Sequence, residues 1–214
     1  MAQVKICGLR SVADVEAVAA AGAAWFGLNF FPPSPRFLGL ELARALAIAA
    51  PVGLAKVALT VDADEATLDA IVEAMPLDML QLHGHETPEK VSAVRARYGL
   101  PVMKVMGVRD EGDLAGLMDY STVADMIMID AKPPKGAVLP GGNGVPFDWR
   151  LVAQRRWLRP WMLAGGLTAD NVAEAIRLTN ARAVDVASGV ESVPAIKDYA
   201  KVANFIAAAG LHNG

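Results

Sequence analysis

The residue with the clearest capacity for chemistry is Cys7, the only cysteine of the chain. It lies at the end of an alternating apolar run, residues 4–8, which predicts a strand followed by a loop. In parallel α/β proteins the carboxyl end of a strand is where chemistry is done. A single thiol forms no internal disulfide and no multi-cysteine metal site, so Cys7 is a nucleophile, a base, or a small buried hydrophobic residue.

Asp130 is the second candidate, because it follows the apolar run 126–129. Its carboxyl should emerge at the rim of a buried strand, where partial desolvation favours the protonated form and suits a general acid. A helix cap or a salt bridge to Lys132 is the alternative. Cys7 and Asp130 belong to the first and sixth predicted strands, which would let them face each other across a small ligand.

Arg36 follows prolines at positions 32, 33 and 35, which would hold its guanidinium in place for bidentate capture of a carboxylate. A solvated surface arginine is the alternative. His83 and His85 have the spacing of a metal-binding pair on one strand face. A metal centre needs further histidines, and the remaining one, His212, lies in the terminal tail. The sequence therefore favours a ligand-contacting or loop-positioning role for His83.

Glycines follow the last two predicted strands, in the pairs Gly165-Gly166 and Ser188-Gly189. Loops at this place in parallel barrels often hold a phosphate, because glycines let backbone N–H groups converge on it. Either pair by itself would be read as a turn. A third run, residues 141–144, falls in the sixth connection and either folds over a ligand or is flexible. The phosphate-binding candidates are Gly142, Gly144, Gly165, Gly166, Ser188 and Gly189.

The elements that must position these residues alternate along the whole chain. Apolar runs predict eight strands, at residues 4–8, 25–30, 54–60, 79–83, 102–108, 126–130, 161–164 and 183–187. Helical periodicity predicts helices at residues 12–21, 40–50, 65–75, 88–98, 110–118, 169–178 and 195–209. Repeated βα units of this kind predict an α/β fold, a (β/α)8 TIM barrel, as a single domain over residues 1–214. An open doubly wound sheet is the alternative, but its glycine fingerprint does not follow the first strand.

Composition excludes several classes of partner. Charged residues make up 20% of the 214 residues, the net charge is -3 and no basic run occurs, so no nucleic-acid partner is expected. The first residues lack the apolar stretch of a signal peptide, and no apolar segment reaches membrane-spanning length. The sequence therefore predicts a soluble cytoplasmic protein with no membrane partner.

Together the motifs resemble the phosphoribosylanthranilate isomerase family of tryptophan biosynthesis. The resemblance is carried by KICG (5–8), GLNFF (27–31), SPR (34–36), QLHG (81–84), ID (129–130), GGNG (141–144), FDW (147–149), LAGGL (163–167), VDVASGVE (184–191) and KD (197–198). The chain departs from the family's usual pattern at residues 131–132, where it has Ala-Lys and a Ser-Lys pair is more common. It also departs at Asn143, where Thr is frequent. Neither departure touches Cys7 or Asp130.

The resemblance implies a cofactor-free Amadori rearrangement of N-(5-phosphoribosyl)anthranilate to 1-(2-carboxyphenylamino)-1-deoxyribulose 5-phosphate. Asp130 would be the general acid that opens the ribose ring to an iminium, and Cys7 the general base at C2. Arg36 would bind the anthranilate carboxylate, His83 would contact the substrate, and the glycine loops would bind its phosphate. The expected assembly is a monomer or a homodimer.

The sequence is compatible with two other functions. An indole-glycerol-phosphate synthase shares the barrel and the phosphate site, but it would be expected to place lysine and glutamate at the strand ends. A barrel that only binds a sugar phosphate would make Cys7 and Asp130 structural. The base assignment also needs a group that lowers the pKa of Cys7, because an ordinary thiol is mostly protonated at neutral pH. Lys5, two residues away on the same strand face, is not an obvious candidate.

Overall fold

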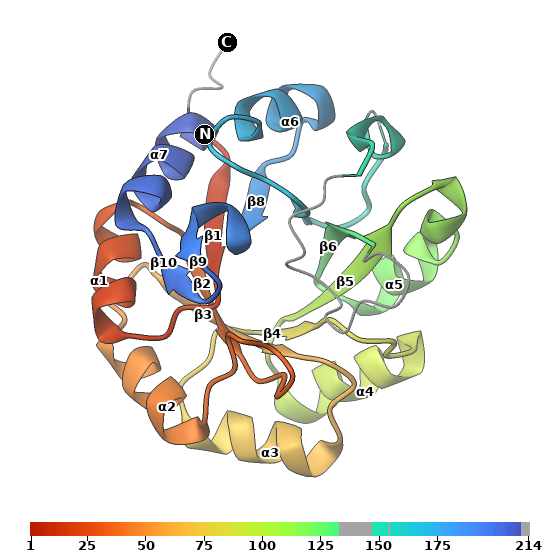
Figure 1. Cartoon of the computed structure of the whole chain (residues 1–214). Helices are drawn as coiled ribbons and strands as arrows, with labels where there is room; N and C mark the ends of the chain where they lie inside the picture. The colour runs from red at the N-terminus through yellow and green to blue at the C-terminus, as the bar shows by residue number, and fades with distance from the viewer. Residues whose placement is uncertain (133–146, 154, 211–214) are drawn as a thin grey trace.

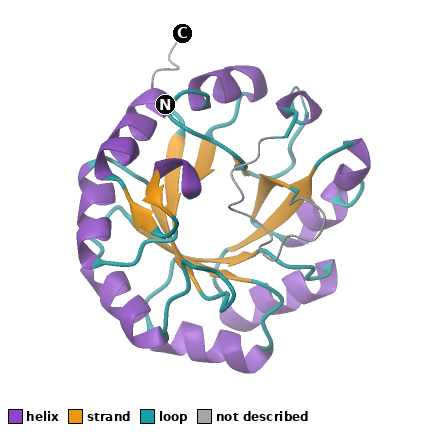
Figure 2. Ribbon diagram, in the orientation of Figure 1, coloured by secondary structure: helices purple, strands orange, loops and turns teal. Residues whose placement is uncertain are grey.

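The computed structural model describes residues 1–132, 147–153 and 155–210, which form a closed barrel of eight parallel strands in the order β1 to β8. Figures 1 and 2 show the strands enclosed by a ring of helices. The predicted (β/α)8 fold is therefore confirmed. That one domain extends over residues 1–214 stays a prediction, because residues 133–146, 154 and 211–214 lie outside the described chain.

All eight strands lie within one residue of the predicted bounds. They are β1 (Gln3–Cys7), β2 (Trp25–Asn29), β3 (Ala55–Thr60), β4 (Met79–Leu82), β5 (Val102–Val108), β6 (Met126–Ala131), β7 (Trp161–Leu163) and β8 (Ala183–Val186). Pairing of β1 with β8, in which Lys5 is opposite Asp185, closes the barrel. Aliphatic residues and methionine dominate the strands because both faces of a parallel barrel strand are covered.

Successive side chains of each strand divide between two cores. Outward residues such as Ile6 and Phe26 are fully buried and belong to the main core between the strands and the helices. Inside the barrel, a smaller core is built around methionines from β5, β6 and β7, among them Met103, Met128 and Met162. The interior beside β1 and β8 holds charged residues instead, and these are the ones that matter for the site.

The helices begin and end at local signals in the sequence. They are α1 (Val12–Ala20), α2 (Leu40–Ala49), α3 (Glu65–Ala74), α4 (Pro88–Tyr98), α5 (Leu117–Val123), α6 (Val172–Thr179) and α7 (Tyr199–Gly210), with short 3-10 helices η1 (Glu111–Leu114), η2 (Trp149–Leu151) and η3 (Ser188–Val190). Ser11 and Asp14 form a capping box that starts α1. Thr87 caps α4, and Gly99 ends it with φ 62°. No helix in the described part of the chain has the length and apolar character needed to cross a membrane.

The helix predicted over residues 110–118 is wrong. Asp110 and Asp113 form a capping box around a tight 3-10 turn, η1, which stops after one turn. A separate helix, α5, then begins at Leu117 after Gly116 and continues to Val123. The apolar periodicity in this segment therefore belongs to two short elements rather than to one helix.

The last helix begins later than predicted, at Tyr199 rather than at residue 195. The preceding residues form an antiparallel hairpin of β9 (Glu191–Val193) and β10 (Ile196–Lys197). Ala195 lies in the turn of this hairpin with φ 67°, a value outside the right-handed helical region. Helix α6 also begins later than predicted, at Val172 rather than at residue 169. The hairpin brings Glu191 and Lys197 into the candidate site.

Candidate active site

The carboxyl ends of the strands bring the predicted residues to one mouth of the barrel. Cys7 is the last residue of β1 and Asp130 the last but one of β6, and they are only 5% and 6% exposed. Arg36 lies in the loop after β2, so close to Gly8 that a Cβ on this glycine would be 2.5 Å from the Arg36 Cδ atom. His83 directly follows β4. The mouth therefore collects a buried thiol, a buried carboxyl, a guanidinium and an imidazole.

Asp130 is held by a histidine and by the backbone. His83 Nε2 lies 3.4 Å from Asp130 Oδ2, and the Ala131 N–H donates to Oδ1 at 2.7 Å. The alternative salt bridge from Lys132 is wrong, because the Lys132 ammonium pairs with Asp113. Within the described ranges, no lysine or arginine forms an ion pair with Asp130. Its carboxyl is thus fixed in position by an imidazole and a backbone N–H.

The two histidines of the H-x-H pair take different directions. Gln81 Nε2 is 3.3 Å from His83 Nδ1, so the imidazole of His83 is held on both sides. The His85 side chain is 97% exposed and pairs with Asp62 at 3.2 Å. In the described part of the chain, no group of three or more His, Cys, Asp or Glu residues has the geometry to hold a metal ion. The arrangement supports a role for His83 next to Asp130.

Arg36 is buried, which makes the surface alternative wrong. Its Nε and Nη2 atoms donate to Glu191 Oε1 and Oε2 at 2.7 and 2.8 Å, a bidentate pair along one edge of the guanidinium. The Ser34 hydroxyl accepts from the Arg36 backbone N–H and fixes the loop. For Nη1, no acceptor is found among the residues that the structure describes. A ligand carboxylate would therefore meet Arg36 at the end of its side chain.

Glu191 lies in the candidate site, and the sequence analysis did not single it out. Besides Arg36 it accepts a hydrogen bond from Lys197 Nζ at 2.9 Å, and Lys197 also donates to the Ala187 carbonyl at 3.0 Å. Burial would raise the pKa of Glu191, but the hydrogen bond from Arg36 and the charge of Lys197 outweigh it, so the pKa is lowered. Glu191 thus stays charged and joins the β9–β10 hairpin to the loop after β2.

Lys5 is the second residue whose place in the site the sequence did not reveal. Its side chain is fully buried, and Nζ donates to Asp185 Oδ1 at 2.8 Å. Burial raises the pKa of the Cys7 thiol, and Lys5 is the charge that opposes this most strongly. The expectation that Lys5 is no obvious influence on the thiol is therefore wrong.

A charged residue inside an apolar strand run is the sequence signal that would have identified a buried ion pair such as that of Lys5 and Asp185. Lys5 stands between Val4 and Ile6, and Lys104 stands in the buried strand β5. Because an unpaired buried charge is costly, each must have a partner. Lys104 finds its partner in Glu86 at 2.6 Å.

The two glycine loops lie against each other at the mouth. A Cβ on Gly189 would be 2.0 Å from the Leu167 carbonyl oxygen, so the loops after β7 and β8 are in contact. Gly165 and Gly166 have φ 89° and 65°, and among the described residues their N–H groups have no acceptor. Donors of this kind suit a phosphate. The other predicted phosphate ligands, Gly142 and Gly144, lie outside the described residues.

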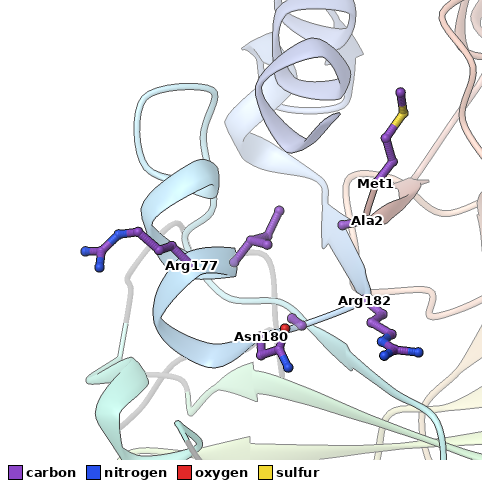
Figure 3. A pocket seen from close by; sticks show the side chains of 7 residues that line it. Met1, Ala2, Arg177, Asn180 and Arg182 are labelled. Carbon is purple, nitrogen blue, oxygen red and sulfur yellow. The ribbon is translucent and has the colours of Figure 1, made fainter. Parts of the chain in front are cut away.

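The opposite end of the barrel has a cavity of a different character. It measures about 590 Å³ and is lined by Met1, Ala2, Ile176, Arg177, Asn180, Ala181 and Arg182. Figure 3 shows the guanidinium groups of Arg177 and Arg182 extending away from each other, so they do not converge on one anion. None of the acid, base or nucleophile candidates lines this cavity.

The fold and the mouth together define an enzyme of the (β/α)8-barrel class that works by acid and base chemistry. Comparison with known proteins gives the family. The family described as N-(5'phosphoribosyl)anthranilate (PRA) isomerase matches residues 4–208. The N-(5'-phosphoribosyl)anthranilate isomerase of Cereibacter sphaeroides (strain ATCC 17029 / ATH 2.4.9) is 67% identical over 204 residues, which cover 95% of this chain and 96% of that protein.

Solved structures agree with this match. Phosphoribosyl anthranilate isomerase from Thermotoga maritima superposes with a TM-score of 0.89 at 33% identity, covering 98% of this chain and 99% of that one. A phosphoribosyl anthranilate isomerase in complex with reduced 1-(o-carboxyphenylamino)-1-deoxyribulose 5-phosphate gives 0.86 at 31% identity, with 98% and 99% covered. The chain belongs to the N-(5'-phosphoribosyl)anthranilate isomerase family. Its activity is accordingly that of an aldose–ketose isomerase in tryptophan biosynthesis.

Proposed function

We propose that Cys7 and Asp130 are the general base and the general acid of an Amadori rearrangement of N-(5-phosphoribosyl)anthranilate to 1-(2-carboxyphenylamino)-1-deoxyribulose 5-phosphate. The observation that carries this proposal is the placement of a buried thiol and a buried carboxyl at the carboxyl ends of β1 and β6. These are the two proton-transfer groups that an isomerisation between neighbouring carbons needs. The family's reaction supplies the substrate.

Asp130 acts first in the proposed sequence. Its carboxylic acid donates a proton to the ribose ring oxygen as the bond from this oxygen to C1 breaks. The lone pair of the anthranilate nitrogen forms the C1–N double bond, which gives an open-chain iminium. His83 and the Ala131 N–H support this role because they hold the carboxyl in one orientation.

Cys7 acts on the iminium. As a thiolate it removes the proton from C2, and the C–H electron pair forms the C1–C2 double bond while the iminium electrons return to nitrogen. The enolamine then gains a proton at C1 and loses the hydroxyl proton at C2 to give the ketone. The iminium is itself the electron sink, so the step needs no metal or cofactor from the protein.

The ends of the substrate have separate proposed contacts. Arg36 would hold the anthranilate carboxylate through the edge that Glu191 leaves open. Gly165, Gly166, Ser188 and Gly189 would bind the phosphate through backbone N–H groups, and Gly142 and Gly144 would add to them from the sixth connection. His83 would contact the ribose side of the substrate through its position beside Asp130.

The substitutions Cys7→Ala and Asp130→Asn test the assignment. Each should lower kcat about 100- to 10,000-fold, followed as the loss of the anthranilate substrate's fluorescence. His85→Asn, at an exposed histidine two residues from His83, is the matched control and should retain full activity. Near wild-type turnover by Cys7→Ala would remove the base assignment. A chain that binds substrate without turnover would instead be a sugar-phosphate binder.

We also propose a cytoplasmic location, a monomeric or homodimeric assembly and a cofactor-free reaction. A cytoplasmic location fits a biosynthetic enzyme, and cell fractionation would test it. Sedimentation would decide between a monomer and a homodimer. A cofactor-free reaction predicts undiminished turnover after dialysis against a chelator, and loss of turnover that added metal restores would contradict it.

A further inference from the structure

Lys5 lies beside the thiol that the proposed reaction uses. A Cβ on Gly27 of β2 would be 2.7 Å from Cys7 Sγ and 3.2 Å from Lys5 Nζ, so the two atoms are separated by no more than about 6 Å. Both side chains come from β1 and point into the barrel, and Lys5 is fully buried. The absence of a side chain at Gly27 leaves the space that allows this approach.

The charges around Cys7 do not cancel when the thiol is neutral. They come from five elements: Lys5 on β1, Arg36 in the loop after β2, Asp185 on β8, Glu191 on β9 and Lys197 on β10. Arg36 and Lys197 share the carboxylate of Glu191, while Lys5 pairs with Asp185. Three cations thus face two carboxylates. A thiolate at Cys7 would supply the missing negative charge.

We propose that Lys5 is a positioning residue that stabilises the thiolate form of Cys7, with Asp185 fixing its ammonium group. This inference rests on the proposed role of Cys7 as the base. It assigns to the Lys5–Asp185 pair a function in the reaction rather than in folding alone.

The protonation of Lys5 is consistent with this role. Burial would lower its pKa, but Asp185 and Cys7 outweigh burial, so the pKa of Lys5 is raised. Lys197 differs, because burial lowers its pKa despite the charge of Glu191. Lys5 is therefore a buried cation whose charge is maintained by its neighbours despite burial.

The test is a pH titration of the thiolate by its ultraviolet absorbance. Cys7 is the only cysteine, so each curve reports on this group once the matching Cys7→Ser chain is subtracted. Lys5→Met should raise the midpoint by about 1 to 3 pH units, because it removes an opposite charge. Asp185→Asn should lower the midpoint, because it removes a like charge. Lys5→Arg should leave the midpoint near that of the wild type.

The opposite shifts expected for Lys5→Met and Asp185→Asn distinguish the proposal from a purely structural role of the Lys5–Asp185 pair. If the pair were only structural, loss of either partner would move the midpoint of Cys7 in the same direction. Lys56→Met is the matched control, because Lys56 pairs with Asp78 at 2.7 Å and is in register with the outward residue Phe26. It should leave the midpoint unchanged.

An unchanged midpoint in Lys5→Met, or shifts of the same sign in both variants, would overturn the proposal. If circular dichroism shows that Lys5→Met does not fold, Lys5→Gln replaces it, because it removes the charge but keeps a hydrogen-bond donor for Asp185: a raised midpoint supports the role of Lys5, and an unchanged or lower one refutes it. The proposed role of Cys7 as the base is tested by a different experiment, and an active Cys7→Ala chain would overturn it. The thiol titration of the other variants could still be measured after that result.

Discussion

The two sides of the barrel mouth surround their reactive groups differently. The cysteine side, defined by Lys5, Cys7, Arg36, Asp185, Glu191 and Lys197, holds a thiol among three cations and two carboxylates. The aspartate side, defined by Gln81, His83 and Asp130, holds a carboxyl beside an imidazole, an amide and a backbone N–H. Burial raises the pKa of the Cys7 thiol, and the positive charges around it oppose that rise. The two sides therefore differ in the way that the roles we propose for Cys7 and Asp130 differ.

The largest effect is expected when either Cys7 or Asp130 is replaced. Cys7→Ala and Asp130→Asn should each lower kcat about 100- to 10,000-fold, and the double variant should lose about as much as the slower single variant. The reason is that the two groups act in successive steps, so the slower step alone sets the rate. Steady-state assays of the three chains measure this. Losses that multiply would show that both groups act in one step.

Glu191→Gln should produce the largest change in stability. It leaves Arg36 and Lys197 buried with a neutral partner, which should lower the free energy of unfolding at neutral pH by about 3 kcal/mol. The pKa of Glu191 is lowered in the folded chain, so its contribution is present above its unfolded pKa and is lost as the pH falls through the folded one.

Urea denaturation at several pH values measures this difference. The gap between wild type and Glu191→Gln should be full at neutral pH and should shrink in acid. Asp148→Asn is a suitable control, because Asp148 forms its ion pair with Arg150 at the surface, where such pairs contribute little. A gap that does not change with pH would mean that the charge of Glu191 is not what stabilises this side.

Gly27→Ala and Gly107→Ala form a matched pair on the two sides. Gly27 is in register with Cys7, and its Cβ would be 2.7 Å from Sγ, so the alanine must displace the thiol. Gly107 is in register with Asp130, but its Cβ would meet only Lys132, at an ordinary contact distance of 3.5 Å. Gly27→Ala should lower kcat about 100-fold through misplacement of the base, and Gly107→Ala should change it little. Equal losses in both variants would contradict the crowding at Cys7.

The sequence was sufficient to place the reactive groups, because each of them ends a strand. Cys7 and Asp130 follow from apolar runs whose carboxyl ends must meet in a parallel barrel. The eight strands were predictable for the same reason, since burial on both faces leaves an uninterrupted apolar signal. Helix 110–118 was not, because a capping box local to Asp110 outweighed the periodicity around it.

The partners of the charged residues could not be predicted. Lys5 and Asp185 are 180 positions apart, and Arg36 and Glu191 are 155 apart, so no local pattern links them. A lysine inside an apolar run indicates that a carboxylate must lie nearby, but only the register of β1 against β8 shows which one. The β9–β10 hairpin adds a second obstacle, because the segment that carries Glu191 and Lys197 was partly assigned to a helix.

The smallest effect is expected on the aspartate side, for His83→Asn. The contact between His83 Nε2 and Asp130 is long, 3.4 Å, whereas the Ala131 N–H holds the other carboxyl oxygen at 2.7 Å. Loss of one such contact is worth about 1 kcal/mol, so kcat should fall less than about tenfold. His85→Asn should have no effect, as its side chain is exposed. A thousandfold loss in His83→Asn would require His83 itself to move the proton, and the aspartate side would then resemble the cysteine side in depending on a second titratable group.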